Sequence, residues 1–528
     1  MASVLDRLTL PTAGLPHQVS DVEAKWDAPS WGRLWEMGVG KTWPTIVEAA
    51  LLFQANLIDC LVVVAPKAAA LNFVVDQVKQ HMPPDVNACC HAYSIPDRQK
   101  DWHIASLDKL LAHWRARAGL VVLTVSYEAI MRDECKEILK ALARCRKVGA
   151  SWVGDGRMMI VADESSLLGN DGSQRTQRAY SLSDVSGFRR ILEGTPVTNN
   201  PLNIYPQMKF LDPEFWKRER IYSFEEFQAM FAVVVKTPSF QVTSKWIDRK
   251  TGKPKQYMVP MVKGFQNLGV LQRMLLAGAS RLTTEQAGIV LPPQHYQRIK
   301  FKLHPKQRKM YDTLKKECMV YLDSGQAVTA PLAMVKMLFL QQLASGFLPV
   351  EDPDGSRTKE RIIPDKDNPR LEAALERLSL VPHQTIIFAR FDAEVDMLRL
   401  GIESELKEKS LQFDGRTSDR ARVANLEAFK AGDAKFMVGK VGAMGRSLTL
   451  VTAKRTMYYS NDFAYGNRKQ SEKRIHRIGQ TEHCFYDDLE AIDTIDQKII
   501  TSMLTKDDLA AQVTGDELRE WLTDSPLI

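Results

Sequence analysis

The sequence lacks the features that mark membrane, secreted and disordered proteins. In its 528 residues no uninterrupted apolar run reaches the roughly 18 residues that would span a bilayer, so we expect no membrane partner. The beginning, MASVLDRLTLPTAG, has no cationic stretch followed by a long apolar one, so we expect no secretory signal. Hydrophobic residues make up 45% of the chain and charged residues 26%, which is the composition of a globular protein.

Cysteine is scarce and the charge is nearly balanced. The seven cysteines include no pair of C-x-x-C units, which argues against both a disulfide framework and a zinc site. A reducing compartment fits, so we expect the cytoplasm of a prokaryote or of a virus's host cell, or the nucleus of a eukaryote. The net charge of +7 permits a nucleic-acid partner through a local basic track but does not by itself indicate one.

The hydrophobic pattern predicts an α/β protein with two parallel-sheet lobes in tandem. The chain is too long for one ordinary core. Short β-branched runs alternate with amphipathic stretches in one series, LIDCLVVVAP, GLVVLTVSY, MMIVADE and RRILEGTP. A second series follows: QTIIFAR, LQFDG, KFMVGK, RTMYYSN and CFYDDLEAI. Runs this apolar are typical of parallel strands buried on both faces and covered by crossover helices.

The two series set the expected domain boundaries. We predict an N-terminal ATP-binding lobe over residues 1–212 and a C-terminal lobe with terminal helices over residues 383–528. Residues 213–382 between them are expected to be a mostly helical insertion and linker, with a hairpin that turns at Thr251 and Gly252. Because open parallel sheets bind ligands beyond the carboxyl ends of their strands, the loops there should carry the chemistry.

The segment WEMGVGKT, residues 35–42, is typical of a phosphate-binding loop. Its glycines let backbone N–H groups close on phosphate oxygens, Lys41 reaches the β- and γ-phosphates, and the Thr42 hydroxyl can ligate Mg²⁺. The strict pattern has glycine where Trp35 stands, and a structural turn is the alternative that the motif alone leaves open. The predicted loop contacts to ATP are Gly38, Val39, Gly40, Lys41 and Thr42.

Two carboxylates, Asp163 and Glu164, follow the apolar run MMIVA directly. That placement suits one carboxylate that holds Mg²⁺ and a second that orients and deprotonates the attacking water. Taken alone, the pair could instead be acidic residues that stabilise a helix N-terminus. Together with the phosphate loop on another strand end of the same lobe, it predicts an ATPase whose cofactors are ATP and Mg²⁺.

The second lobe carries RKQSEKRIHRIGQ over residues 468–480. Arg474 and Arg477 are three residues apart, so on a helix both guanidiniums would share one face and could point at one target. Planar, permanently charged guanidiniums suit the charge that develops on a transferring phosphoryl group. Spacing alone would favour the alternative, a solvated basic helix.

Taken in order, these segments resemble the sucrose-non-fermenting (Snf) branch of superfamily-two helicase-like ATPases, over nearly the whole chain. EMGVGKT is similar to motif I, DESS to motif II, EGTPVTNN to motif III, GAMGRSLTL to motif V and QSEKRIHRIGQ to motif VI. The resemblance implies two RecA-like lobes that bind ATP between them, with Gln18 of LPHQ reading adenine. It implies that the catalytic residues are Lys41, Glu164, Arg474 and Arg477.

The resemblance also implies coupling and DNA-binding residues. The coupling residues would be Ser166, where the family has histidine, and the matching motif III and VI residues Thr195 and Gln470. The DNA-binding candidates lie at motif loops: Lys67, Ser126, Thr195, Arg416 and Thr449. Hydroxyls in such loops also cap helices, which is the alternative for each of them. In motif V, Ala443 and Ser447 replace a glycine and an asparagine, which puts individual contacts there in doubt.

As a member of this family the chain would be a monomeric, ATP-dependent translocase on double-stranded DNA that does not separate the strands. A helicase or annealing helicase acting on forked DNA is the alternative within the same core. A non-catalytic interaction protein is the alternative of another class, against which the intact catalytic residues argue. The basic segment 249–255 could brace DNA, although a charged exposed hairpin is the favoured interpretation.

Overall fold

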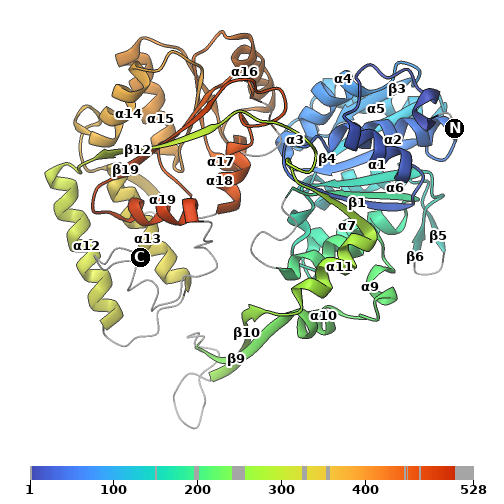
Figure 1. The fold of residues 1–528 in the computed structure, drawn as a ribbon, viewed down its shortest axis with the longest axis horizontal. Helices are drawn as coiled ribbons and strands as arrows, with labels where there is room; N and C mark the ends of the chain where they lie inside the picture. Colours follow the sequence, from blue (N-terminus) through green and yellow to red (C-terminus); the bar gives the residue numbers. More distant parts are fainter. Residues whose placement is uncertain are drawn as a thin grey trace. The chain divides into compact units, whose positions relative to one another are not determined.

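The computed structural model describes residues 3–148, 151–194, 201–240, 256–323, 330–351, 357–444, 448, 450–462 and 465–505. The chain divides into two compact units, Met1–Gly288 and Ile289–Ile528, called here the first and the second unit (Figure 1). No helix among the described residues is long and apolar enough to cross a membrane.

The first unit is built on a seven-stranded sheet in which every paired strand is parallel to its neighbours. In spatial order its strands are β11 (Ala279–Leu282), β1 (Ser30–Trp35), β8 (Phe188–Leu192), β7 (Met158–Asp163), β2 (Cys60–Ala65), β4 (Leu120–Ser126) and β3 (Ala88–Ala92). The order matters for function, because β8 lies between β1 and β7 and all three end at the same edge.

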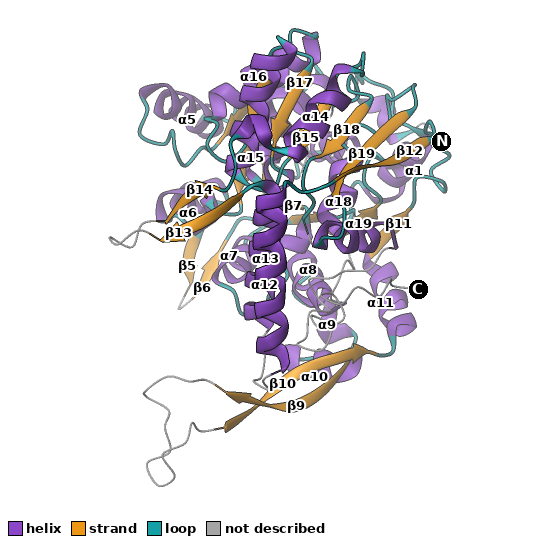
Figure 2. Ribbon diagram, turned by 90° about the vertical axis from the view of Figure 1, so that its left-hand side faces the viewer, coloured by secondary structure: helices purple, strands orange, loops and turns teal. Residues whose placement is uncertain are grey.

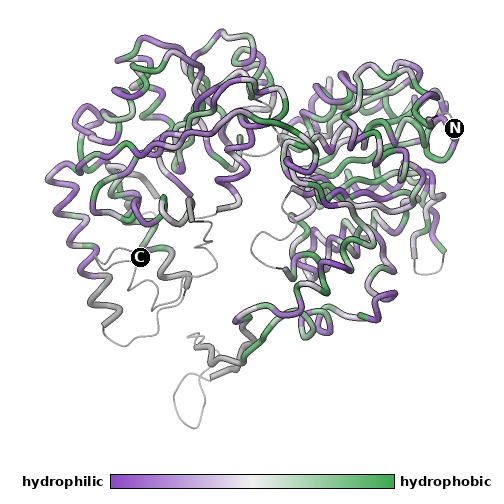
Figure 3. Tube along the Cα trace, viewed as in Figure 1, coloured by the Kyte–Doolittle hydropathy of each residue, from purple (hydrophilic) through white to green (hydrophobic). Residues whose placement is uncertain are grey.

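Burial on both faces explains why these strands are so apolar. All six residues of β2 are buried. Cys60, Val62 and Val64 pack into one core of the unit. Leu61, Val63 and Ala65 pack into a second core, as expected when successive side chains alternate across a sheet. Stretches of hydrophobic chain, drawn in green, accordingly run through the first unit in Figure 3.

The helices of the first unit are α1 (Pro16–Lys25), α2 (Thr42–Gln54), α3 (Lys67–Asn72), α4 (Lys79–His81), α5 (Asp101–Arg115), α6 (Asp133–Leu142), α7 (Gln174–Asp184), α8 (Ile204–Leu211), α9 (Phe215–Arg218), α10 (Phe224–Phe231) and α11 (Leu268–Gly278). Helix α1 precedes the first strand, and the other helices of the first unit lie between its strands in the chain. A short antiparallel pair, β5 (Arg146–Val148) and β6 (Ser151–Val153), lies between α6 and β7 in the chain.

The predicted hairpin is present. Strands β9 (Ala232–Phe240) and β10 (Gln256–Phe265) pair antiparallel and form a long ribbon beside α10 (Figure 2). The expected turn at Thr251 and Gly252 and the basic segment 249–255 lie outside the described residues.

The second unit has a six-stranded sheet, again parallel at every pair. Its order is β12 (Gln294–Phe301), β19 (Cys484–Ala491), β18 (Arg455–Tyr458), β15 (Thr385–Phe388), β17 (Phe436–Gly439) and β16 (Ser410–Phe413). Strand β15 sends Ile387 into one core, whereas Ile386 and Phe388 enter the other. This sheet too is therefore buried on both faces.

The helices of the second unit are α12 (Pro305–Asp323), α13 (Ala330–Ser345), α14 (Pro369–Ser379), α15 (Asp392–Gly401), α16 (Asp419–Ala431), α17 (Val441–Met444), α18 (Tyr465–Glu472) and α19 (Ile495–Thr505). Strands β13 (Phe347–Glu351) and β14 (Arg357–Arg361) pair antiparallel after α13.

The predicted fold class, two parallel-sheet lobes in tandem, is confirmed. Residues 213–382, expected as insertion and linker, are shared between the units. Strand β11 forms one edge of the first sheet and β12 one edge of the second, so the chain passes from unit to unit between these two strands. Edge strands expose part of their length, which is why the polar sequence QHYQRIKF of β12 gave no strand signal.

Candidate nucleotide site

The loop between β1 and α2 has the backbone of a phosphate cradle. Gly38 and Gly40 have φ angles of 88° and 90°, in the left-handed region that side chains other than glycine rarely adopt. Helix α2 begins immediately afterwards at Thr42, so the loop leads into a helix N-terminus, where unsatisfied N–H groups attract anions. The Lys41 ammonium folds back over the loop and donates to the Trp35 carbonyl oxygen at 2.9 Å.

Trp35 stands where the strict motif has glycine, and the structure gives it an anchoring role. Its side chain is 1% exposed. Its indole N–H donates to the Ser280 hydroxyl at 2.8 Å, which ties the start of the loop to β11. Trp35 in place of glycine therefore holds the start of the loop against β11, while the loop keeps Gly38 and Gly40.

Gln18, the predicted adenine reader, lies against this loop. Its amide nitrogen donates to the Gly40 carbonyl oxygen at 2.7 Å, and its amide oxygen accepts from the Leu15 N–H at 2.8 Å. A Cβ on residue 40 would collide with the Gln18 side chain, which is a second reason for glycine there. The His17 ring, which the sequence did not single out, lies 2.9 Å from the Val39 carbonyl oxygen through its Nε2.

The acidic pair lies at the end of β7 in an unusual conformation. Glu164 is 8% exposed and has φ 52° and ψ 53°, a left-handed backbone that costs a residue other than glycine about 1–3 kcal/mol. Asp163 accepts the Glu164 N–H through its Oδ1 at 3.1 Å, and its carbonyl oxygen accepts the Tyr127 hydroxyl at 2.9 Å. Burial, with the nearby Asp163 carboxylate, raises the pKa of Tyr127. Strain held in place in this way is typical of functional positions.

The loop after β8 joins the other two. Glu193 is fully buried, and its Oε2 accepts the backbone N–H of Ser166 at 2.7 Å. Ser166 thus contacts the motif III segment through its backbone N–H. Gly194 packs closely against the phosphate loop. A Cβ on residue 194 would lie only 2.5 Å from Met37 Cγ, so a larger residue would not fit there. Thr195, the other predicted coupling residue of this segment, lies outside the described residues.

Glu193 was missed by sequence reasoning, although it follows a buried strand and precedes Gly-Thr-Pro. With it, the loops after β1, β8 and β7 meet at one edge of the sheet. Adjacent strands are about 4.8 Å apart, so the phosphate loop and the acidic pair are separated by roughly 10 Å. That spacing leaves room for a triphosphate and its metal between Lys41 and Asp163.

A buried ionic network lies beneath this edge. Glu48 of α2 accepts from both Arg33 of β1 and Arg190 of β8, and all three side chains are fully buried. Asp21 of α1 accepts from Arg33 Nε at 2.7 Å and from the Ser280 hydroxyl at 3.1 Å. Burial opposes the charge of Arg33, but attraction to Glu48 and Asp21 outweighs it and raises its pKa. The network joins the helices and strands that carry the nucleotide motifs.

In the second unit the predicted helical placement of the two arginines is wrong. Helix α18 ends at Glu472, and Arg474 and Arg477 lie in the turns that follow. After Glu472 the hydrogen-bond pattern changes: the Arg474 N–H donates to the Ser471 carbonyl oxygen at 3.1 Å, and the Arg474 carbonyl oxygen accepts the Leu450 N–H at 3.0 Å, which joins it to the motif V segment. Both guanidiniums donate to the Leu448 carbonyl oxygen, at 3.0 and 3.4 Å.

Gln470, the third predicted coupling residue, lies on α18 and is 9% exposed. Its carbonyl oxygen accepts Arg474 Nε at 2.9 Å, so the last turn of the helix orients that guanidinium. The structure thus brings Gln470 and Arg474 together directly, through the backbone of one and the side chain of the other.

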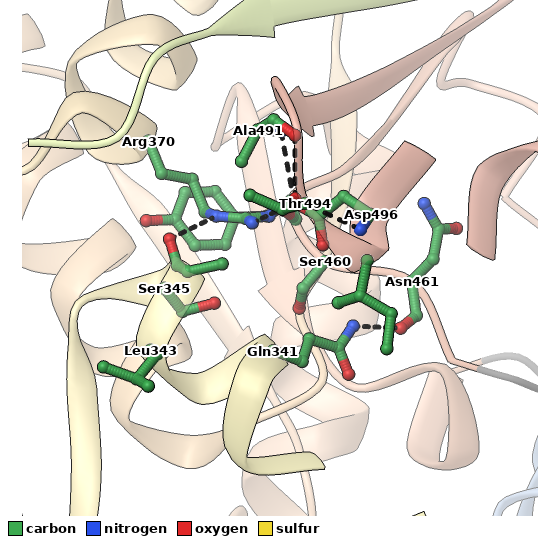
Figure 4. Close-up of polar contacts among 12 residues, drawn as sticks. Gln341, Leu343, Ser345, Arg370, Ser460, Asn461, Ala491, Thr494 and Asp496 are labelled. Atoms are coloured by element: carbon green, nitrogen blue, oxygen red, sulfur yellow. Dashed lines mark hydrogen bonds and ion pairs between the residues drawn. The ribbon is translucent and has the colours of Figure 1, made fainter. Parts of the chain in front are cut away.

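Buried polar contacts fix the start of α18. Gln341 of α13 donates to the Asn461 carbonyl oxygen at 2.7 Å, a contact marked in Figure 4. The Asn461 side chain accepts from Arg468 at 2.9 Å. Arg468 is 5% exposed and forms a two-armed ion pair with Asp488 of β19. Because α18 is held at its first turns, the turns that carry the two arginines begin from a fixed point.

The DNA-binding candidates have different surroundings. Lys67 is exposed at the first position of α3. The Ser126 hydroxyl accepts the Ala129 N–H at 3.1 Å and so caps a turn, as the alternative predicted. The Arg416 guanidinium donates to Asp396 and Asp414, and these hydrogen bonds raise its pKa. Thr195 and Thr449 lie outside the described residues.

The oxygen ligands at the sheet edge suit Mg²⁺ bound together with ATP. A hydroxyl at Thr42 and a carboxylate at Asp163 are the hard oxygen ligands that Mg²⁺ takes alongside substrate phosphates. Within the described ranges no group of three or more His, Cys, Asp or Glu side chains could hold a metal ion.

The comparison with protein families decides the classification. The SNF2-related domain matches residues 35–344 and the helicase conserved C-terminal domain matches residues 370–479. The chain belongs to the SNF2-related family. This is a family of helicase-like ATPases, and the match covers more than half of the chain, including the phosphate loop and the acidic pair.

Known proteins similar to this SNF2-related chain include the SWI/SNF chromatin-remodeling complex subunit snf22 of Schizosaccharomyces pombe, 24% identical over 90% of this chain and 26% of that protein. The DNA annealing helicase and endonuclease ZRANB3 of Homo sapiens is 22% identical over 68% of this chain and 30% of that protein. The chain therefore spans less than a third of either relative. The Sulfolobus solfataricus SWI2/SNF2 ATPase core in complex with dsDNA matches 100% of both chains at 19% identity, with a TM-score of 0.39.

Proposed function

We propose that this SNF2-related chain hydrolyses ATP to move along double-stranded DNA without separating the strands. The observation that carries the proposal is the meeting of three loops at one sheet edge: the phosphate loop, the strained Asp163–Glu164 pair and the Glu193 segment. Two arginines that converge on one carbonyl oxygen in the second unit supply the remaining groups that such chemistry needs. The two relatives are named for chromatin remodelling and DNA annealing, which supports a DNA substrate.

Each residue at the edge has a role in this reaction. The loop N–H groups and Lys41 hold the phosphates, and Thr42 with Asp163 would hold Mg²⁺, which supplies charge neutralisation when bound. Glu164 orients a water and accepts its proton as that water attacks the γ-phosphorus and the bond to the β-phosphate oxygen breaks. Arg474 and Arg477 stabilise the developing charge, an effect worth about 10³ to 10⁵ in rate for an arginine finger.

Coupling of hydrolysis to movement would use the contact between Ser166 and Glu193. When the acidic pair changes position during turnover, the Ser166 N–H moves with it, and the buried Glu193 carboxylate carries that movement into the motif III segment. That segment leads to Thr195, which we propose as both a coupling residue and a contact to the DNA backbone.

Movement along any sequence requires contacts to phosphate and sugar rather than to bases. Lys67 is the candidate whose exposure suits such a contact best. Arg416 could reach phosphate only by leaving two carboxylates, so we expect its contribution to be smaller. Ser126 and Thr449 complete the proposed set, with Ser126 acting through the turn that it caps.

A helicase or annealing helicase acting on forked DNA is the second candidate. It is favoured by the similarity to a protein named as an annealing helicase, which this chain matches over 68% of its length. Product analysis separates the two candidates: a forked substrate opened or closed in an ATP-dependent manner would identify a helicase or annealing helicase. A translocase would leave the fork unchanged while it displaces a protein or a third strand from a duplex.

The proposed function is tested by measuring ATPase rates with single-stranded DNA, duplex DNA, forked DNA and structured RNA. We expect the greatest stimulation by substrates that contain B-form duplex, because A-form RNA presents a different groove and phosphate spacing. The apparent DNA affinity should fall steeply with salt, since sequence-blind binding gains free energy from released counterions. Equal stimulation by structured RNA would contradict the assignment of duplex DNA as the substrate. No ATP turnover with any of these nucleic acids would contradict the proposal that the chain is an ATPase.

A further inference from the structure

The phosphate loop is bonded to the segment through which the chain leaves the first unit. Glu36, the first loop residue after β1, accepts both the N–H and the hydroxyl of Thr284 through its Oε2, at 2.8 and 2.6 Å. Its own N–H donates to the Leu282 carbonyl oxygen at 2.8 Å. Thr284 lies two residues after the end of β11, and the second unit begins at Ile289.

Other contacts attach the same stretch to the base of the loop. The Trp35 indole donates to the Ser280 hydroxyl, and that hydroxyl donates to Asp21 of the buried network. Strand β11 pairs with β1 in register up to Trp35 and Leu282. The outgoing segment is thus bonded to successive residues from β1 into the loop.

A movement of the loop therefore reaches the outgoing segment directly. We expect nucleotide phosphates bound by the loop to attract Lys41 away from the Trp35 carbonyl oxygen and to repel the Glu36 carboxylate, which lies five residues before Lys41. The Glu36 carboxylate is held by two donors of Thr284, one of them a rotatable hydroxyl, so its displacement is transmitted to the residues that precede Ile289.

We propose that Glu36 and Thr284 form a coupling contact that transmits nucleotide occupancy of the phosphate loop to the segment that joins the two units. Both are positioning residues, since they act through the loop and the segment. The inference rests on the proposed function and deepens it by naming a route, within the first unit, from bound nucleotide to the second unit.

Two adjacent threonines give a matched test. Thr284→Val keeps the side-chain volume and removes the hydroxyl donor to Glu36. Thr283→Val is the control, because the Thr283 hydroxyl accepts only the nearby Gln286 N–H in the same turn and does not reach the loop. Both variants of the full chain are compared with the parent for ATPase rate with and without blunt duplex DNA, and for amide hydrogen exchange of residues 279–293 with and without ADP.

We expect Thr284→Val to retain the basal ATPase rate and to lower the ratio of DNA-stimulated to basal kcat at least about fivefold, the lower end of typical coupling between sites. Because displacement of Glu36 weakens its hydrogen bonds to Thr284, ADP should speed exchange in residues 279–293 of the parent and of Thr283→Val but not of Thr284→Val. Glu36→Ala should lower the same ratio, and adding Thr284→Val to it should have no further effect, since both act through one contact.

Three results would overturn the coupling contact: an unchanged ratio in Thr284→Val, equal losses in the two threonine variants, or no effect of ADP on exchange of the segment in the parent. These outcomes leave the proposed function standing if the parent turns over ATP with DNA stimulation. A parent that binds no nucleotide overturns the proposed function and the inference with it.

Discussion

Replacing Glu48 by alanine should destabilise the first unit strongly. The Glu48 carboxylate is fully buried and neutralises two fully buried guanidiniums, those of Arg33 and Arg190. After the change Arg33 keeps Asp21 at 2.7 Å, but Arg190 loses its ion pair and keeps only backbone carbonyls such as that of Ala28. Removing one partner of a buried ion pair costs about 3–5 kcal/mol. At roughly 2–4 °C per kcal/mol the melting temperature should fall by about 6–20 °C.

The measurement is calorimetry of the parent, Glu48→Ala, Glu48→Gln and a surface control, Glu137→Ala. Glu137 forms an exposed ion pair with Lys140 at 3.0 Å, and such pairs contribute at most about 1 kcal/mol. Glu48→Gln should fall between the two because the amide keeps the shape and loses the charge. If Glu48→Ala melts within a few degrees of Glu137→Ala, the buried network does not hold the helix that follows the phosphate loop.

Two further outcomes follow from the nucleotide-site residues, and a third from His91, a buried histidine of β3. Glu164→Gln should bind ATP with Mg²⁺ but turn it over at least about a hundredfold more slowly, and normal saturated turnover would exclude Glu164 as the base. Arg477→Ala should bind ATP within about tenfold of the parent and lose at least about a hundredfold in kcat, whereas a surface arginine would change kcat less than about twofold. Burial, helped by His103, lowers the pKa of His91 to about 4. The contribution of neutral His91 to the free energy of unfolding is therefore complete above about pH 6.5 and is smaller by roughly 2 kcal/mol at pH 5. His91→Asn should reduce this loss, as measured by thermal unfolding at pH 5 and pH 7.

How far the sequence could predict the fold depended on burial. Strand β2, with every residue buried, gave a continuous apolar run that could be recognised directly. Strand β12 could not be recognised, since most of its side chains are exposed at the sheet edge and most of them are polar. Its pairing with β19, nearly 190 residues away in the sequence, depends on tertiary contacts that no local pattern records.

The residues of the candidate site also differ in whether the sequence alone could indicate them. Lys41 and Asp163 could be proposed from the sequence because their proposed roles need a fixed residue type, for Lys41 in the loop before α2 and for Asp163 at the end of β7. Glu193 and Glu36 could not, because their roles arise from contacts with Ser166 and Thr284, which are distant in the chain. The helix predicted to carry both motif VI arginines was too long. After Glu472 the Arg474 N–H donates to Ser471, three residues back, and its carbonyl oxygen accepts from Leu450, outside that segment.

The ATPase rate of Lys41→Ala, with and without saturating duplex DNA, tests the central claim most directly. The Lys41 ammonium lies at the N-terminus of α2 and donates to the Trp35 carbonyl oxygen. Its removal should cost less than about 1 kcal/mol of stability, so the melting temperature should stay within about 2 °C of the parent's. We expect the parent to hydrolyse ATP faster on duplex DNA and the folded variant to show no turnover above background. Near-normal, DNA-stimulated turnover by folded Lys41→Ala would contradict the nucleotide site and the motor built on it.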